Sequence, residues 1–270
     1  MRRLAVVLVF ALPLSAQEAN LFPRFSLTGS TGPSSFDTNV RVDPETLPGG
    51  ETLEGTLINL ETDLGLEDER TLRRYGLQWR PFARHELSVM VFSAPREGLQ
   101  QIDREITFRD EVYPVSALVA SRFDLDYASA TYTYWARRSE RDGFGLSLGV
   151  ANIALEASVT ATNPIGNVTI TETAETEAPV VLVGAQGRVA FTNRIHGEAT
   201  IAALPSVTIE DYSGSALTGS AKLEYRPIRW LGIGASYHYF RLDVDVDAAD
   251  LSGTLEMTTR GPEVFVRLAF

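Results

Sequence analysis

Residues 231–239 read Leu-Gly-Ile-Gly-Ala-Ser-Tyr-His-Tyr, and every second residue of this stretch is apolar. The apolar positions are Leu231, Ile233, Ala235, Tyr237 and Tyr239. Successive side chains of a β-strand point to opposite faces, whereas a helix would need apolar residues three and four positions apart. The stretch therefore predicts a β-strand with one apolar face and one face of small or polar groups.

The same alternation recurs along the chain, with Gly, Pro, Asn and Asp between the runs. It is found in residues 87–91, 128–134, 144–150, 181–191 and 217–225. Such a series predicts an all-β protein with antiparallel strands. Alternation alone is also typical of a water-soluble, lipocalin-like barrel, which remains the alternative fold. The face opposite the apolar residues here is glycine, serine, threonine and charge, which favours a transmembrane barrel with a hydrophilic interior.

Composition narrows the functional classes. The 270 residues include no cysteine, so a disulfide scaffold and a cysteine-ligated metal site are excluded. Acidic residues outnumber basic ones, 35 against 24, giving a formal net charge of −11 that argues against a nucleic-acid partner. We expect no cofactor and no metal.

The N-terminus predicts export. Residues 1–16 contain Arg2 and Arg3, then an apolar run that is too short to span a bilayer, then Leu14-Ser15-Ala16. This order is typical of a secretory signal peptide, and we expect cleavage after Ala16. Loss of the two arginines would take the net charge from −11 to −13. Residues 17–270 are expected to form one barrel domain.

The positions of the tryptophans and the lengths of the connections favour the transmembrane barrel over the water-soluble one. Trp79, Trp135 and Trp230 all lie beside short turn signals, as an aromatic girdle at a membrane interface requires. Short connections near 81–84, 137–142, 192–194 and 227–229 alternate with long or polar ones near 31–69, 95–116, 157–178, 210–214 and 247–255. Transmembrane barrels have short turns on the periplasmic side and longer loops outside.

The final strand carries a family resemblance. It alternates Val264, Val266, Leu268 and a C-terminal Phe270, and so resembles the assembly signal of bacterial outer-membrane β-barrel proteins. Phe265 departs from the glycine often found there. The segments FDTNVRVD, GTLINLETDLGL and DREITFRDEVYPV also look like a set of uncharacterised outer-membrane barrels. The resemblance implies the outer membrane of a Gram-negative-type bacterium, with membrane lipids and the barrel-assembly machinery as partners.

Four short turns and two periplasmic termini predict a transmembrane antiparallel up-and-down barrel of about ten strands. Their membrane portions are expected near 22–30, 70–80, 84–94, 118–136, 143–153, 179–191, 195–205, 215–226, 230–242 and 261–270. Twelve strands is the alternative if residues 31–69 supply two more. Several hairpins are expected to extend beyond the membrane, and residues 169–178 are expected to be a loop.

The hydrophilic face supplies candidate lumen-lining residues. They are Arg74, Gln78, Glu86, Gln186, Arg188, Glu198, Lys222, Glu224 and His238. Expected pairs are Arg74 with Glu86, Arg188 with Glu198, and Lys222 with Glu224 or Glu198. Two interpretations stay open: mutual neutralisation inside a filled barrel, or a solute path whose selectivity these charges set.

No enzymatic activity is expected. The Asp-x-His pair that omptin-like proteases need is absent, as are the common hydrolase and nucleotide-binding motifs. His238 with Ser236 is the remaining candidate for a surface hydrolase. The acidic runs near Asp124 and Asp243 indicate a solvated surface more than a calcium site. The functions expected are a structural or surface-interaction barrel or, alternatively, a narrow passive channel for small solutes.

Overall fold

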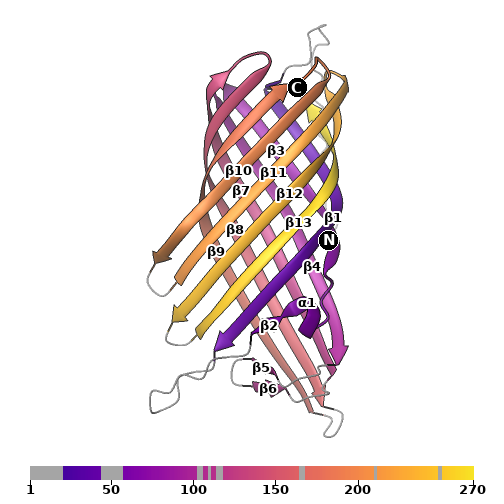
Figure 1. The fold of residues 1–270 in the computed structure, drawn as a ribbon, viewed down its shortest axis with the longest axis vertical. Helices are drawn as coiled ribbons and strands as arrows, with labels where there is room; N and C mark the ends of the chain where they lie inside the picture. Colours follow the sequence, from indigo (N-terminus) through magenta and orange to yellow (C-terminus); the bar gives the residue numbers. More distant parts are fainter. Residues whose placement is uncertain are drawn as a thin grey trace, which may run out of the picture.

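The computed structural model describes residues 21–43, 57–101, 106–108, 111–113, 118–163, 168–209, 212–248 and 251–270. The predicted signal peptide lies outside these residues. Ten antiparallel strands form one sheet that closes when the first strand pairs with the last. The barrel strands are β1 (Phe25–Asp43), β3 (Glu69–Phe82), β4 (His85–Gln101), β7 (Leu118–Arg138), β8 (Asp142–Asn163), β9 (Val168–Ala190), β10 (Ile195–Ile209), β11 (Tyr212–Ile228), β12 (Leu231–Ala248) and β13 (Leu251–Ala269). Figure 1 shows them as a tall barrel of steeply tilted strands.

Besides the ten barrel strands, the described residues include three short strands and one helical turn. The strand β2 (Ile58–Asn59) pairs with the far part of β1, and the helix α1 (Leu60–Asp63) follows it directly. The Asn59 side chain caps this helix by accepting a hydrogen bond from the Thr62 amide. β5 (Ile106–Phe108) and β6 (Glu111–Tyr113) form a separate hairpin. No helix in the described part of the chain is long and apolar enough to cross a bilayer.

The prediction of ten strands is confirmed, and the alternative of twelve is wrong. All four predicted short turns lie at one end of the barrel, together with Phe25 and the C-terminal strand end; we call this the turn end and the opposite one the loop end. In Figure 1 the turn end is uppermost. The predicted loops are shorter than expected, because β8 and β9 remain paired as far as Asn163 and Val168. Residues 169–178 are therefore strand and not loop.

The outer wall near the turn end is apolar. Leu87, Leu148, Val183 and Ile233 all point outward and are exposed, with Val183 57% accessible. The residues between them face the lumen. Such an outward apolar band is expected of a barrel whose wall contacts lipid. The inversion that the sequence predicts, with apolar side chains outside and hydrophilic ones inside, is present in this half.

The polarity of the wall reverses toward the loop end, which the sequence analysis did not predict. On β12 the inward residue changes from His238 to Phe240, and the outward residue changes from Tyr239 to Arg241. The outward residue likewise changes from Val91 to Ser93 on β4 and from Ala128 to Asp126 on β7. We call this level the polarity switch. Beyond it the interior is an apolar core that includes Phe92, Leu125, Tyr127, Ile153, Leu182, Phe240, Leu242 and Met257.

The segment from β2 to Leu66 completes this core. Ile58, Leu60, Leu64 and Leu66 are buried in it, and Leu66 bridges to Gly98 of β4. From Ser35 toward the loop end the strand β1 no longer pairs with β3, so this segment occupies the wall between β1 and β4. The loop-end half is therefore built like a water-soluble barrel, with apolar residues inside and charge outside.

The closing seam between β1 and β13 contains two opposed prolines. The register is the same at Thr31–Val264 and at Ser35–Arg260, which places Pro33 opposite Pro262. Neither residue has an amide hydrogen to donate across the seam. The backbones also approach closely here, since a Cβ on Gly32 would lie 2.1 Å from the Pro262 carbonyl oxygen. Glycine is required at that position.

Candidate functional site

A buried ion pair crosses the lumen near the turn end. Arg188 of β9 donates to both carboxylate oxygens of Glu86 on β4, at 2.7 and 2.9 Å. β7 and β8 lie between these strands in the sheet, so the contact spans the interior. Both side chains are almost completely buried. A pair of this kind is retained only when each charge has a close partner, because desolvation is expensive.

Further charged groups extend this contact into a network. Glu198 accepts from Arg188 at 3.0 Å and from Lys222 at 3.0 Å, while Glu224 accepts from Arg267 at 2.8 Å. Arg226 and Arg267 add contacts to Glu224 and Glu198. We call these seven residues the lumenal ion-pair network: Glu86, Arg188, Glu198, Lys222, Glu224, Arg226 and Arg267. Three carboxylates against four cations leave it nearly neutral, as a buried cluster requires.

Aromatic side chains cover the network at the turn end. Trp135 is fully buried and donates from its indole nitrogen to Glu86 at 3.3 Å. The Phe22 ring packs edge-on against it with centroids 4.8 Å apart. The guanidinium group of Arg188 lies over the Trp135 ring at 4.7 Å. The residues just before β1 therefore fold into the barrel and help to fill it.

A second buried cluster lies near the middle of the lumen. Glu263 of β13 contacts Arg74 of β3, and its other oxygen lies 3.2 Å from Nε2 of His238. Ser236 is paired in register with Glu263 and is buried, but its hydroxyl makes no hydrogen bond to His238. The residues needed for a serine nucleophile are therefore neighbours without being assembled as an activated set.

A small cavity separates the charged half from the apolar half. It measures about 160 Å³, and many of its lining residues bear a hydroxyl group: Thr28, Ser30, Ser88, Ser129, Thr131, Thr133, Ser147, Thr200, Thr218, Ser220 and Ser236. On its loop-end side Tyr127 stacks on Phe92, with ring centroids 4.9 Å apart, and meets Phe240 across the lumen at 6.0 Å. The volume is sufficient for several water molecules and the lining could satisfy their hydrogen bonds.

At the loop end a buried arginine holds the β2–α1 segment in place. Arg96 of β4 is fully buried, forms an ion pair with Glu61 of α1 and donates to the Thr38 hydroxyl at 2.9 Å. Its guanidinium group also lies 4.3 Å from the centre of the Phe36 ring. Ser121 adds a hydrogen bond to the Leu64 carbonyl at 3.1 Å. This arrangement fixes the segment against both neighbouring walls.

No family model and no curated protein match the sequence. Among solved structures, the outer membrane protease OmpT from Escherichia coli superposes with a TM-score of 0.59 at 9% identity, covering 96% of this chain and 99% of that chain. The chain has the fold of the bacterial outer-membrane β-barrel proteins. Together with the outward apolar band, this supports an outer-membrane location.

Two further bacterial barrels align over most of their length with lower scores. The transport unit of the Escherichia coli autotransporter AIDA-I gives a TM-score of 0.45 at 8% identity, covering 97% of this chain and 94% of that chain. Ail of Yersinia pestis gives 0.31 at 11% identity, covering 89% and 99%. At 9% identity, the likeness to OmpT is one of fold alone.

The structure places the predicted lumen-lining residues inside the barrel. Arg74, Glu86, Gln186, Arg188, Glu198 and Glu224 are buried there, and Gln78, Lys222 and His238 line the central cavity. Arg188 does pair with Glu198, and Lys222 pairs with Glu198. The predicted pair between Arg74 and Glu86 is wrong, because the register aligns Arg74 with Phe92, six residues along β4 from Glu86.

The prediction that all three tryptophans belong to an aromatic girdle is wrong for Trp135. Trp79 and Trp230 lie outward at the turn end and are about half exposed, whereas Trp135 faces the lumen. Its neighbour Tyr134 is on the outward face of β7, so the alternation turns Trp135 inward. In the last strand, Val264, Val266, Leu268 and Phe270 occupy the outward face and Phe265 is buried inside.

Several charged residues of the site were missed. Glu263 and Arg267 lie in the predicted last strand, on the face opposite its valines, so the alternation could have identified them. Arg226 could have been found in the same way on β11. The Arg96–Glu61 pair could not, because it depends on how the segment after β1 folds back. The acidic candidates Asp124 and Asp243 each pair with an arginine two residues away, Arg122 and Arg241.

Proposed function

We propose that this protein is a closed outer-membrane barrel whose role is structural or surface-interacting and is exercised at its loop end. The observation that carries the proposal is that side chains occupy the lumen at two successive levels. The lumenal ion-pair network fills the level near the turn end, and the apolar core with the β2–α1 segment fills the level beyond the polarity switch.

The outer surface of the loop-end half supports a role in contacts outside the membrane. Its outward residues include the exposed pairs Arg122–Asp124 and Arg241–Asp243, which are suited to water and not to lipid. The strands continue well past the polarity switch, as far as Gln101 on β4 and Asn163 on β8. This half would stand above the bilayer and present a rigid charged wall to partners.

The proposed setting follows from the same features. The mature chain would start after Ala16, insert through the barrel-assembly machinery and keep its turn end in the periplasm. The outward Val264, Val266 and Phe270 would serve as the assembly signal. Outer-membrane lipids would contact the apolar band. A nucleic-acid partner is not proposed, because the chain is acidic overall.

Conductance in planar bilayers tests the closed lumen against a narrow passive channel. We expect the wild-type barrel to give no single-channel steps. The two filled levels block the lumen in series, so opening only one of them should still give no conductance. Glu86→Ser with Arg188→Ser opens the level of the lumenal ion-pair network, and Tyr127→Ala with Phe240→Ala opens the level of the apolar core. Combining all four substitutions should produce steps. Reproducible steps from the wild-type protein would favour the passive channel.

The non-enzymatic assignment is tested with peptide and lipid substrates. His238 is engaged by Glu263 in the interior, and its access is limited by the residues above and below the central cavity. We expect no turnover from the wild-type protein and none from His238→Ala. Turnover that disappears in His238→Ala, with the barrel still folded, would instead identify a hydrolase.

A further inference from the structure

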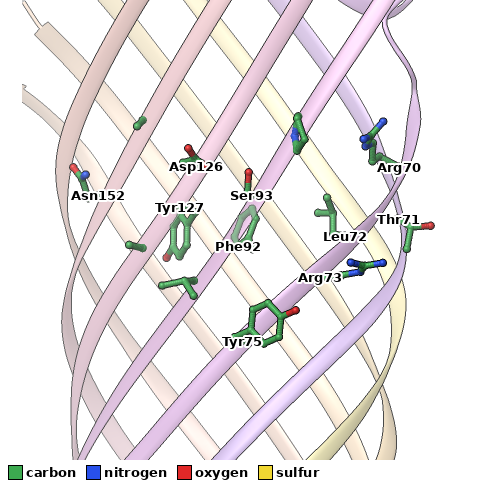
Figure 2. Close-up of a pocket in the computed structure, with 14 residues that line it drawn as sticks. Arg70, Thr71, Leu72, Arg73, Tyr75, Phe92, Ser93, Asp126, Tyr127 and Asn152 are labelled. Carbon is green, nitrogen blue, oxygen red and sulfur yellow. The ribbon is translucent and has the colours of Figure 1, made fainter. Parts of the chain in front are cut away.

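The outer wall of the barrel contains a groove. It measures about 760 Å³ and crosses β3, β4, β7 and β8. Figure 2 shows Arg73 at one side of the groove and Asp126 and Asn152 at the other, with Ser93 between them and Tyr75 below Ser93 in this view. The groove is separate from the lumenal cavity, although Tyr75 and Tyr127 contribute to both.

A break in the sheet explains why the wall is hollowed here. Pairing between β3 and β4 ends at Arg73 and Ser93. Two residues further along β4, Pro95 has no amide hydrogen to offer to β3. Without a continuous ladder the strands separate. The inward side chains Leu72 and Phe92 then form part of the groove lining.

The outward residues of the groove form two transverse rows. Strand register aligns Arg73 with Ser93 and Ser93 with Asp126, which gives the order cation, hydroxyl, anion. Adjacent strands lie roughly 4.8 Å apart, so the Cα atoms of Arg73 and Asp126 are about 10 Å apart. The next row toward the turn end aligns Tyr75, Val91, Ala128 and Asn152.

The two rows lie on either side of the polarity switch. The row of Val91 is the last of the outward apolar band, and the row of Ser93 is the first of the hydrophilic wall. In a bilayer this is the level at which acyl chains give way to headgroups. The chemistry required of an occupant is thus an apolar body joined to a charged head.

The row nearer the loop end contains two charged side chains that form no ion pair with another described residue. Among the described residues neither Arg73 nor Asp126 has an ion pair, and Arg70, the other cation of the groove, is held by Glu67 at 2.5 Å. On the opposite wall the outward pair Arg241 and Asp243 do bind each other, at 3.0 Å. These lie at the same height, because their inward neighbour Phe240 touches Tyr127, the neighbour of Asp126.

We propose that the groove binds a zwitterionic phospholipid with a primary amine, such as phosphatidylethanolamine. The phosphate would bind the Arg73 guanidinium group, and the ammonium would bind the Asp126 carboxylate, with the Ser93 hydroxyl between them. The acyl chains would lie along Val91 and Tyr75. This inference rests on the proposed membrane location, since it takes the apolar band to be in contact with lipid.

Native mass spectrometry of the full barrel in detergent tests the proposal with three lysophospholipid probes. We expect lysophosphatidylethanolamine to bind at least tenfold more tightly than lysophosphatidylglycerol, which lacks the amine, or lysophosphatidylcholine, whose quaternary ammonium cannot donate a hydrogen bond. Arg73→Gln should weaken binding of the ethanolamine lipid about tenfold. Asp126→Asn should remove the preference over the glycerol lipid.

Arg241→Gln and Asp243→Asn are the matched controls, because they remove the same charges at the same height outside the groove. They should leave all three affinities unchanged. Equal affinities for the three probes, or equal effects of groove and control variants, would overturn the proposal. Insertion into vesicles, followed by the heat-dependent shift on gels, is measured on every variant. Failure of the wild-type protein to insert would contradict the membrane location itself, which is a distinct result.

Discussion

Arg188 of β9 binds Glu86 of β4 across the lumen, with 2.7 Å between Nη2 and Oε1. Replacing Arg188 by Leu would leave Glu86 buried without its main cation. We expect the free energy of unfolding to fall by about 3–5 kcal/mol, the usual cost of breaking a buried pair. Urea unfolding of the barrel in lipid vesicles measures it.

The matched control for that variant is Arg137→Leu. Arg137 pairs with Asp142 at 2.9 Å, but its side chain is 73% exposed. Exposed pairs contribute at most about 1 kcal/mol. Similar losses for the two variants would show that the lumenal ion-pair network is not a major source of stability.

The polarity switch predicts opposite tolerance for charge on two outward aliphatic residues. Val183 lies in the apolar band and Leu99 lies beyond the switch, and both are well exposed. Val183→Arg should cost about 2–4 kcal/mol in vesicles, because a cation would face acyl chains. Leu99→Arg should change stability and insertion little, since its side chain faces water. The fraction of refolded protein in vesicles distinguishes them, and a defect in Leu99→Arg would move the membrane boundary.

The Arg96 contact predicts a selective loosening of the β2–α1 segment. Arg96→Met would leave the Glu61 carboxylate without its cation and the Thr38 hydroxyl without its donor. We expect amide exchange at residues 58–66 to accelerate at least tenfold while β12 and β13 keep their protection. Arg122→Met, at an exposed site on the neighbouring strand, is the control. Uniform acceleration throughout the barrel would argue that Arg96 supports the whole fold.

The turn between β7 and β8 predicts a pH dependence. Hydrogen bonds from Ser139, and then from Arg137, lower the pKa of Asp142 below its ordinary value. A carboxylate with a lowered pKa stabilises the folded state at pH values above the pKa of the unfolded chain. This contribution disappears as the pH falls through the lower folded pKa. Carboxyl titration by NMR should show the shift, and Ser139→Ala should reduce it. An unshifted Asp142 in the wild-type protein would disprove the assignment.

The strand order and the turns could be predicted from the sequence because both depend on local patterns. The alternation in residues 231–239 and the short connections at 81–84 and 227–229 were sufficient for a ten-strand antiparallel barrel. The polarity switch was also present in the sequence, since on β12 the apolar residues move from odd positions to even ones at Phe240. The acidic residues that begin at Asp243 accompany this change of phase.

Side-chain pairing inside the barrel could not be derived in the same way. Whether Glu86 meets Arg74 or Arg188 depends on strand register and on the diameter of the lumen, and neither is a local property. Trp135 shows the related difficulty of assigning one residue from its proximity to a turn. Successive side chains of a strand point to opposite faces, so a residue that faces the membrane interface and one that faces the lumen can be direct neighbours in the sequence.

Before the barrel closes, β1 and β13 are the two edge strands of the sheet, and their unpaired backbone groups can pair with strands of other chains. Pro33 and Pro262 interrupt the row of backbone amide donors on these two edge strands. Once the two prolines face each other, Gly32 and Gly261 still allow the backbones to meet. The same four residues would thus discourage capture by other chains during biogenesis while permitting the chain to join its own two ends.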